Sequence, residues 1–384
     1  MSKKVYEYDF YGKKIVVEHG CLAKQASGSV LVRYNDTVIL TATVINKKAN
    51  LLSDFFPLTV NYQEKLYSVG KIPGGFIKRE GRPTEAATLA ARMIDRPMRP
   101  LFKEDFKNEV QVINTVLSVD QDCSPELTAM LGSSLATMIS GAPFMGPIAG
   151  VKVGFVDGEY IINPTEEELE KSELDLTVAG TIDAINMVEA GAKQVDEEIM
   201  LEGLMKGHEA VKELCKWESE IISDIDSTPF EYESLTIEDS LKDEVTKLIE
   251  KDLDEVLRIK EKLERYGRID EIKDNLLEKY REDNKELEDE ELDLLLVKVE
   301  KIFSDVEYRL FRNIVVKEKI RSDGRKMDEI RPLSTDIDLL PRTHGSALFT
   351  RGETQCLAVT TLGALGEHQI LDGLSLEDEK RFML

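Results

Sequence analysis

The pattern of apolar and polar positions over roughly the first 200 residues predicts strands mixed with helices. Residues 28–44 (GSVLVRYNDTVILTATV) form two strand-like runs around Asn35 and Asp36, which predicts a β-hairpin. Further strands are predicted over residues 151–164, as a hairpin around Asp157 and Gly158, and over residues 174–180 and 184–191. This part of the chain is therefore expected to contain antiparallel sheet.

Helical patterns separate these strands. The first predicted helix spans residues 84–96, where Pro97 is expected to end it. The second follows Ser124, a residue suited to capping a helix N-terminus, and Pro125 in the first turn. A third pattern, over residues 194–217, predicts a long helix that leaves this domain.

The pattern changes after about residue 235, where strand signals nearly disappear. Residues 235–315 contain one glycine and many Glu, Lys and Leu residues, with apolar positions at helical spacing. Residues 231–310 hold 27 acidic and 15 basic side chains, a balance of −12 out of −24 for the whole chain. We interpret this charge run as the solvated face of a small all-helical domain.

Strand-like patterns reappear after the helical segment, and they form part of an internal repeat. Residues 28–43 and 345–360 align without gaps and share six identities in sixteen positions, including Gly28 with Gly345 and Ser29 with Ser346. Duplication predicts an α+β chain with a first core at residues 1–215, an all-helical domain at 216–315 and the beginning of a second core at 316–384. The second copy is much shorter than the first, so we expect the sequence to be the front part of a longer protein.

Composition narrows the class of protein. The hydrophobic fraction is 42% and the charged fraction 32%, values that suit globular domains. No apolar run is long enough to span a membrane and no targeting core is present, so a cytoplasmic protein with no membrane partner is expected. The cysteines and histidines fit no metal or redox spacing: Cys21, Cys123, Cys215, Cys356, His19, His208, His344 and His368.

One basic stretch stands out in this acidic chain, residues 74–102 (GGFIKREGRPTEAATLAARMIDRPMRPLF). It carries six cations against the three acids Glu80, Glu85 and Asp95; the cations are Lys78, Arg79, Arg82, Arg92, Arg96 and Arg99. Its glycines and Pro83 predict an exposed loop, where Phe76 could stack on a base while the cations hold phosphates of single-stranded RNA. The alternative is that Phe76 fills a core position and the arginines pair with the acids.

The stretch 342–355 (RTHGSALFTRGETQ) places His344 close to Thr343 and Ser346. A nucleophile beside a base is conceivable there. The repeat favours a strand entry whose hydroxyls cap a turn, because the first copy has Ser29 but no histidine at the matching position. No acidic stretch has a recognisable Mg²⁺ ligand spacing.

Several long motifs identify a family. Residues 55–102, NEVQVINTVLS, DLTVAGT and the run from RSDGRKMDEIRPL to PRTHGSALFTRGETQ closely resemble bacterial polynucleotide phosphorylase, over essentially the whole chain. The resemblance implies two ribonuclease-PH-like cores around an all-helical domain, followed by two small RNA-binding domains. It implies a ring-shaped homotrimer, with an RNA-degradation complex as a further candidate partner. It also implies an enzyme that uses inorganic phosphate as co-substrate, with Mg²⁺, to degrade RNA from the 3′ end to nucleoside diphosphates, reversibly.

The family's RNA grip, two aromatics followed by two arginines, matches Phe76, Ile77, Lys78 and Arg79. Ile77 cannot stack like an aromatic, and Lys78 lacks the planar fork of arginine. We expect Arg82, Arg92, Arg96 and Arg99 to extend this RNA-binding surface.

The resemblance places the catalytic serines and the metal-binding aspartates beyond Leu384. No catalytic residue or metal ligand is therefore expected in this chain, and we expect the chain alone to be inactive. The leading hypothesis is a phosphate-dependent 3′→5′ exoribonuclease whose first core guides RNA. The alternative is a non-catalytic RNA-binding ring subunit that ends at Leu384.

Overall fold

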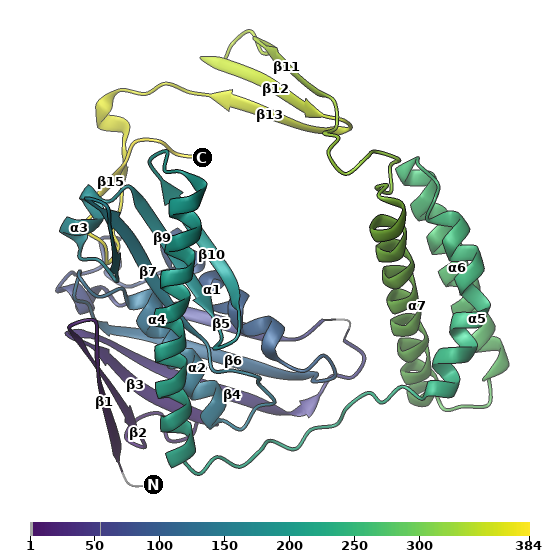
Figure 1. The fold of residues 1–384 in the computed structure, drawn as a ribbon, viewed down its shortest axis with the longest axis horizontal. Helices are drawn as coiled ribbons and strands as arrows, with labels where there is room; N and C mark the ends of the chain where they lie inside the picture. The colour runs from purple at the N-terminus through teal and green to yellow at the C-terminus, as the bar shows by residue number, and fades with distance from the viewer. Residues whose placement is uncertain (1–2, 54) are drawn as a thin grey trace. The chain divides into compact units, whose positions relative to one another are not determined.

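The computed structural model describes residues 3–53 and 55–384, and the chain divides into two compact units (Figure 1). The first unit comprises Met1–Ser234 together with Gln369–Leu384, and the second comprises Leu235–His368. Each unit has its own buried apolar side chains. The predicted α+β class is confirmed, since both helices and largely antiparallel sheets are present.

The first unit is built around two large sheets, and it also contains the short pair β14 Gln369–Ile370 and β15 Glu379–Lys380. The larger sheet has the strand order β1-β2-β3-β4-β6-β5, and only the β5–β6 pair is parallel. Its strands are β1 Lys4–Phe10, β2 Lys13–His19, β3 Gly28–Tyr34, β4 Thr37–Ala49, β5 Leu58–Gln63 and β6 Asn108–Ser118. The smaller sheet is antiparallel in the order β10-β9-β7-β8, with β7 Ala149–Val156, β8 Glu159–Ile162, β9 Leu174–Gly180 and β10 Ile185–Ala192. The hairpins predicted at Asn35-Asp36 and Asp157-Gly158 are confirmed.

Helix α2, Pro125–Ile139, packs against strands of both sheets and is almost entirely buried. Its N-terminus is capped as predicted, because the Ser124 hydroxyl accepts a hydrogen bond from Leu127 N at 3.2 Å. Gly28 in β3 lies so close to this helix that a Cβ atom there would be 2.1 Å from the carbonyl oxygen of Ala136. The helix and the sheet can approach this closely only because residue 28 has no side chain.

Helix α4, Glu197–Asp224, corrects one expectation from the sequence. We expected a helix over residues 194–217 that leaves the domain, but α4 packs along β7 and β9 of the first unit and continues to Asp224 (Figure 1). Gly207 faces the sheet, where a Cβ atom would be 2.9 Å from Val178. The apolar face of the helix is thus used to cover the smaller sheet. The short helix α3, Glu166–Lys171, also belongs to this unit and was not predicted.

Helix α1, Glu85–Met98, corrects a second expectation. We expected Pro97 to end the helix, but Pro97 lies inside the last turn and the 3₁₀ turn Arg99–Leu101 follows directly. A proline in a helix removes one backbone donor, and the loss costs least near the end of a helix. The buried side chains Ile94, Pro97 and Met98 hold this last turn against the core.

The second unit contains the predicted all-helical segment. Its helices are α5 Asp239–Val256, α6 Lys262–Asp283 and α7 Asp289–Glu318. Their apolar faces share one cluster of buried side chains, so the acidic positions form the solvated faces, as the charge pattern indicated. A three-stranded sheet follows, with β11 Leu333–Ile337, β12 Gly345–Arg351 and β13 Thr354–Thr360. No helix in the described part of the chain is long and apolar enough to cross a membrane.

The repeated hairpin is confirmed at the level of register. Gly28 pairs with Thr43 in the first copy, and Gly345 pairs with Thr360 in the second. The turns also match, because Asn35 and Gly352 both adopt positive φ angles, of 49° and 62°. Two segments with different turn residues thus form the same two-residue turn.

Glu218 of α4 is the most unusual core residue of the first unit. Its side chain is fully buried, and neither carboxylate oxygen has a hydrogen-bond partner among the described residues. Burial raises the pKa of Glu218 well above its ordinary value of 4.5, and the nearby Ser134 hydroxyl acts in the opposite direction without offsetting it. The buried site therefore favours the neutral, protonated form of this carboxyl group more than water does.

We predict that Glu218→Gln makes the first unit less sensitive to rising pH. Above pH 4.5 the unfolded state gains stability by ionising Glu218 while the folded state does not, which lowers the free energy of unfolding by about 1.4 kcal/mol per pH unit. Glutamine cannot ionise, so this component of the decline should disappear. Urea unfolding between pH 5 and 8, followed by fluorescence of the single tryptophan, Trp217, measures it. Glu220→Gln, at an exposed position of the same helix, is the control, and equal pH slopes for the Glu218 variant and the wild type would contradict the prediction.

Candidate nucleic-acid interface

Residues 71–84, which we call the basic loop, connect the 3₁₀ turn Leu66–Val69 to helix α1 and contain no helix or strand. Lys78 N donates a hydrogen bond to Gly75 O at 3.1 Å, so Phe76 and Ile77 occupy the two central positions of a tight turn. The Phe76 side chain is fully exposed, and Ile77 is 71% exposed. The alternative in which Phe76 fills a core position is therefore wrong.

Three cations of the basic loop, Lys78, Arg79 and Arg82, have no carboxylate partner among the described residues. Lys78 Nζ donates only to the carbonyl oxygen of Gly74, at 3.4 Å, and no ion pair forms with Arg79 or Arg82 among the described residues. All three side chains are exposed. Their positive charges are consequently uncompensated and lie next to an exposed aromatic ring.

The three arginines of the following helix and turn have three different environments. Arg92 is exposed and has no hydrogen bond or ion pair in the described part of the chain. Arg96 pairs with Glu189 of β10 at 2.7 Å. Arg99 binds both oxygens of Asp95, at 2.9 and 2.7 Å, and also donates to the carbonyl oxygens of Phe56 and Leu58. Arg99 therefore connects the end of α1 to the start of β5.

A cleft of about 490 Å³ lies beside α1, between this helix, α2 and the smaller sheet. Its polar lining includes the carboxylates Glu126, Asp175 and Glu189 and one cation, Lys152. Lys152 already lies 3.7 Å from Asp175, and Glu189 holds Arg96. Three carboxylates against one lysine disfavour a phosphate ligand, so we place the candidate RNA contacts on the basic loop and not in this cleft.

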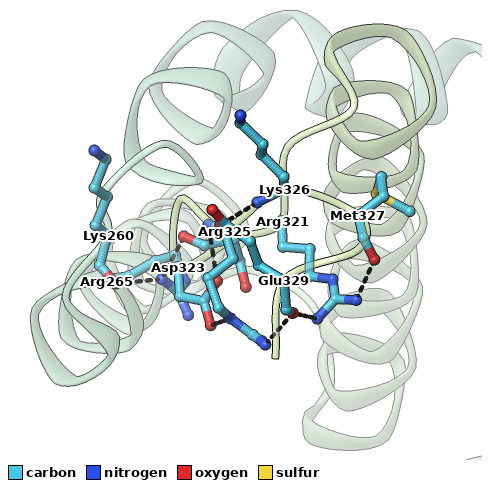
Figure 2. Close-up of polar contacts among 9 residues, drawn as sticks. Lys260, Arg265, Arg321, Asp323, Arg325, Lys326, Met327 and Glu329 are labelled. Carbon is cyan, nitrogen blue, oxygen red and sulfur yellow. Dashed lines mark hydrogen bonds and ion pairs between the residues drawn. The ribbon is translucent and has the colours of Figure 1, made fainter. Parts of the chain in front are cut away.

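A second group of cations, which the sequence reasoning missed, lies in the second unit, where Arg265 of α6 and Arg321, which follows α7, are both drawn in Figure 2. Arg321 donates to the carbonyl oxygens of Met327, at 2.6 Å, and Glu329, at 3.0 Å. Arg265 is buried and donates to three carbonyl oxygens, those of Ile259, Lys260 and Ser322. Because these acceptors are neutral, both guanidinium groups are held in place without an ion pair among the described residues. The run RSDGRK was visible in the sequence, but nothing in it indicates these carbonyl partners.

The residues around His344 form a turn, as the repeat indicated. His344 Nδ1 accepts a hydrogen bond from Leu362 N at 2.9 Å, and the Ser346 hydroxyl accepts one from Leu340 N at 2.9 Å. Thr343 donates its hydroxyl proton to Leu340 O. The histidine is thus bound to backbone and not to either hydroxyl.

No three His, Cys, Asp or Glu side chains come together as a possible metal site within residues 3–53 and 55–384.

Three family profiles match successive parts of the chain. Residues 12–143 match "3' exoribonuclease family, domain 1", and residues 146–210 match "3' exoribonuclease family, domain 2". Residues 240–326 match "Polyribonucleotide nucleotidyltransferase, RNA binding domain". The ribonuclease-PH-like core and the helical region inferred from the sequence are thereby confirmed.

Curated relatives carry the same name. The chain is 56% identical over 382 residues to the polyribonucleotide nucleotidyltransferase of Listeria welshimeri, 53% identical over 383 residues to that of Streptococcus gordonii and 54% identical over 382 residues to that of Bacillus licheniformis. These alignments cover 100% of this chain and 52%, 52% and 53% of the relatives. The chain thus spans about half the length of the curated relatives it matches.

Among solved structures, rice Rrp46 matches with 13% identity and a TM-score of 0.43, covering 58% of this chain and 94% of the rice chain. This likeness is too weak to support an argument about function.

We predict that Arg99→Ala destabilises the first unit, whereas Arg92→Ala does not. The Arg99 variant loses four hydrogen bonds and leaves Asp95 unpaired, which should lower the free energy of unfolding by about 1 to 2 kcal/mol at this half-exposed position. Urea unfolding monitored through Trp217 provides the measurement. Equal unfolding free energies for the two variants would show that the contacts of Arg99 contribute nothing to stability.

Proposed function

Because the chain belongs to the polyribonucleotide nucleotidyltransferase family, we propose that it is the RNA-guiding part of a phosphate-dependent 3′→5′ exoribonuclease acting on single-stranded RNA. The observation that carries the proposal is the tip of the basic loop, where a fully exposed Phe76 lies beside cations that have no carboxylate partner within residues 3–53 and 55–384. Stacking on an aromatic face and phosphate neutralisation are the two interactions that bind a single strand without regard to its sequence.

Each cation is assigned a role according to its environment. Lys78, Arg79 and Arg82 are proposed to bind backbone phosphates, and Arg92 is proposed to continue the same positive surface along α1. Arg96 and Arg99 remain part of the proposed surface, but each already forms an ion pair with a carboxylate. Their contribution to RNA binding should therefore be smaller than that of Lys78, Arg79 and Arg82. Ile77 at the turn offers apolar contact but no aromatic face.

The reaction proposed for the whole protein is phosphorolysis. An oxygen of inorganic phosphate attacks the phosphorus of the 3′-terminal phosphodiester, the bond from that phosphorus to the 3′ oxygen of the preceding nucleotide breaks, and a nucleoside diphosphate leaves. The freed 3′ oxygen takes up a proton, so the shortened RNA ends in a new 3′ hydroxyl, and the reverse reaction extends the chain. The residues of the basic loop contribute by holding the strand in position, which lowers the entropic cost of alignment.

Several features of the whole protein are proposed from the family alone. They are the Mg²⁺ requirement, the homotrimeric ring and membership of an RNA-degradation complex. A cytoplasmic location is proposed with them, and the four free cysteines Cys21, Cys123, Cys215 and Cys356 suit a reducing compartment.

The alternative function, a non-catalytic RNA-binding subunit, shares the basic loop and differs in chemistry. Release of nucleoside diphosphate from poly(A) in the presence of phosphate and Mg²⁺ separates the two hypotheses when the whole protein is assayed. The 384-residue chain is expected to bind poly(A) without releasing nucleoside diphosphate. Robust release by this chain would overturn our assignment of the chemistry to residues outside it.

We predict two separable effects of loop substitutions on the binding of single-stranded RNA. Phe76→Ala removes one stacking contact and should weaken binding by about 1 to 3 kcal/mol while leaving the salt dependence unchanged. Lys78→Ala and Arg79→Ala should each reduce the slope of log K against log salt concentration by about 0.7. Fluorescence anisotropy with a labelled oligo(A) at several salt concentrations measures both quantities.

The control is Phe55→Ala, which removes an exposed aromatic side chain outside the basic loop. Wild-type affinity and wild-type salt slope in all three loop variants would exclude the basic loop as an RNA-binding element.

A further inference from the structure

The start of the basic loop is held by a segment almost 300 positions away in the sequence. Gly74 N donates a hydrogen bond to Asp372 Oδ2 at 2.7 Å, and Lys71 Nζ donates to Gly373 O at 3.0 Å. The approach is close, since a Cβ atom on Gly74 would lie 2.6 Å from the Asp372 carboxylate oxygen. The backbone of the loop is thus fixed two residues before Phe76.

The end of the basic loop is held by the same segment. Lys380 Nζ lies 3.2 Å from the carboxylate of Glu85, the first residue of α1. Thr84, the last residue of the loop, donates its hydroxyl proton to Glu64 at 2.6 Å and caps α1 through Ala87 N. Both ends of the loop are therefore anchored, while its tip at Phe76 and Ile77 is left exposed.

The two contact points are joined by a short ladder. Strands β14, Gln369–Ile370, and β15, Glu379–Lys380, pair in antiparallel register, and Leu371 N donates to Asp378 O at 2.8 Å. Residues 369–380, which we call the anchor segment, thus form a closed structure that carries Asp372 and Lys380 on opposite arms.

The anchor segment is itself attached to the core of the first unit. Leu374 is only 5% exposed and belongs to the apolar cluster that contains Ile94 and Met98 of α1. Gln121 Nε2 donates to Leu374 O at 3.1 Å. Burial of Leu374 fixes the position of the anchor segment, and Asp372 and Lys380 are thereby placed to contact the two ends of the basic loop.

We propose that the anchor segment positions the basic loop for RNA, and that Asp372 and Lys380 are its positioning residues. The inference rests on the proposed function, since it assigns to the loop the RNA contacts described above. A loop without regular structure loses backbone freedom when RNA orders it, and this loss weakens binding. Anchoring both ends removes much of that freedom before RNA arrives.

The first experiment measures loop order without RNA. Trypsin cleaves after lysine and arginine unless a proline follows, and Lys78 and Arg79 lie in the exposed loop with no proline after them. Cleavage at these sites in the full 384-residue chain, followed by mass spectrometry, reports how often the loop opens. Asp372→Ala and Lys380→Ala should each raise the rate of cleavage at these sites, by roughly tenfold for Asp372→Ala, which removes a hydrogen bond to a charged acceptor.

Matched variants separate positioning from general damage. Asp378→Ala and Arg381→Ala alter exposed residues of the same stretch that have no contact with the basic loop among the described residues, so they should cleave like the wild type. Asp372→Asn keeps an oxygen acceptor for Gly74 N and should restore most of the protection. The double variant Glu85→Lys with Lys380→Glu re-forms the ion pair and should cleave more slowly than either single variant. Trp217 fluorescence confirms that each variant is folded.

The second experiment measures affinity for labelled oligo(A) with the same variants. Asp372→Ala should weaken binding by roughly tenfold without changing the salt slope, because no phosphate contact is removed. Wild-type cleavage rates in Asp372→Ala and Lys380→Ala would overturn the positioning inference. Faster cleavage together with unchanged RNA affinity would also overturn the inference, because the anchor would then order the loop without assisting RNA binding. RNA binding by the loop itself is tested separately by the Phe76, Lys78 and Arg79 variants.

Discussion

The packing of helix α2 against both sheets is the constraint on which the first unit depends. A helix buried on nearly every side requires small residues at its closest contacts, and Gly28 and Gly132 supply them against Ala136 and Thr41. The polar groups enclosed by this contact are satisfied internally, since Thr41 and Ser133 both bond the Asn114 side chain. Helix α1 packs on α2 and on β5, so the exposed loop that precedes α1 extends from a rigid frame.

Electrostatics decides where an acidic chain can bind RNA. A net charge of −24 repels phosphate at long range, but repulsion between exposed charges is screened beyond about 8 Å at physiological ionic strength. What matters locally is whether a cation is already neutralised. Arg96 and Arg99 each form an ion pair with a carboxylate, whereas Lys78 and Arg79 form none in the part of the chain that the structure describes. The same short stretch therefore contains structural arginines and cations that are free to meet a phosphate.

The sequence predicted best what depends on near neighbours. Hairpin turns and the Ser124 cap follow from local residue chemistry, and all were found where expected. The direction of α4 was wrong because an apolar helical face indicates burial but not which surface buries it. The parallel pairing of β5 with β6 and the bond from Gly74 to Asp372 join distant positions, and no local pattern carries that information. The sequence left open whether Arg92, Arg96 and Arg99 extend the RNA path or pair with Asp95 or Glu85. The fold pairs Arg99 with Asp95, one helical turn away, and pairs Arg96 with the distant residue Glu189.

The repeated hairpin separates local from tertiary determinants of structure. Both copies form the same register and the same two-residue turn, although the first is buried beneath α2 and every residue of β13 in the second is exposed. Burial therefore does not set the register; the turn and the cross-strand pairs, such as Leu31 with Leu40 and Leu348 with Leu357, are sufficient. Burial sets a different property, tolerance of substitution. A Cβ atom added to Gly28 would lie 2.1 Å from a backbone oxygen, so a larger residue cannot fit there. A Cβ atom added to the equivalent Gly345 would lie 3.6 Å from its nearest neighbour, which is an ordinary contact. Identical residues in the two copies are thus held by different forces, local in one and tertiary in the other.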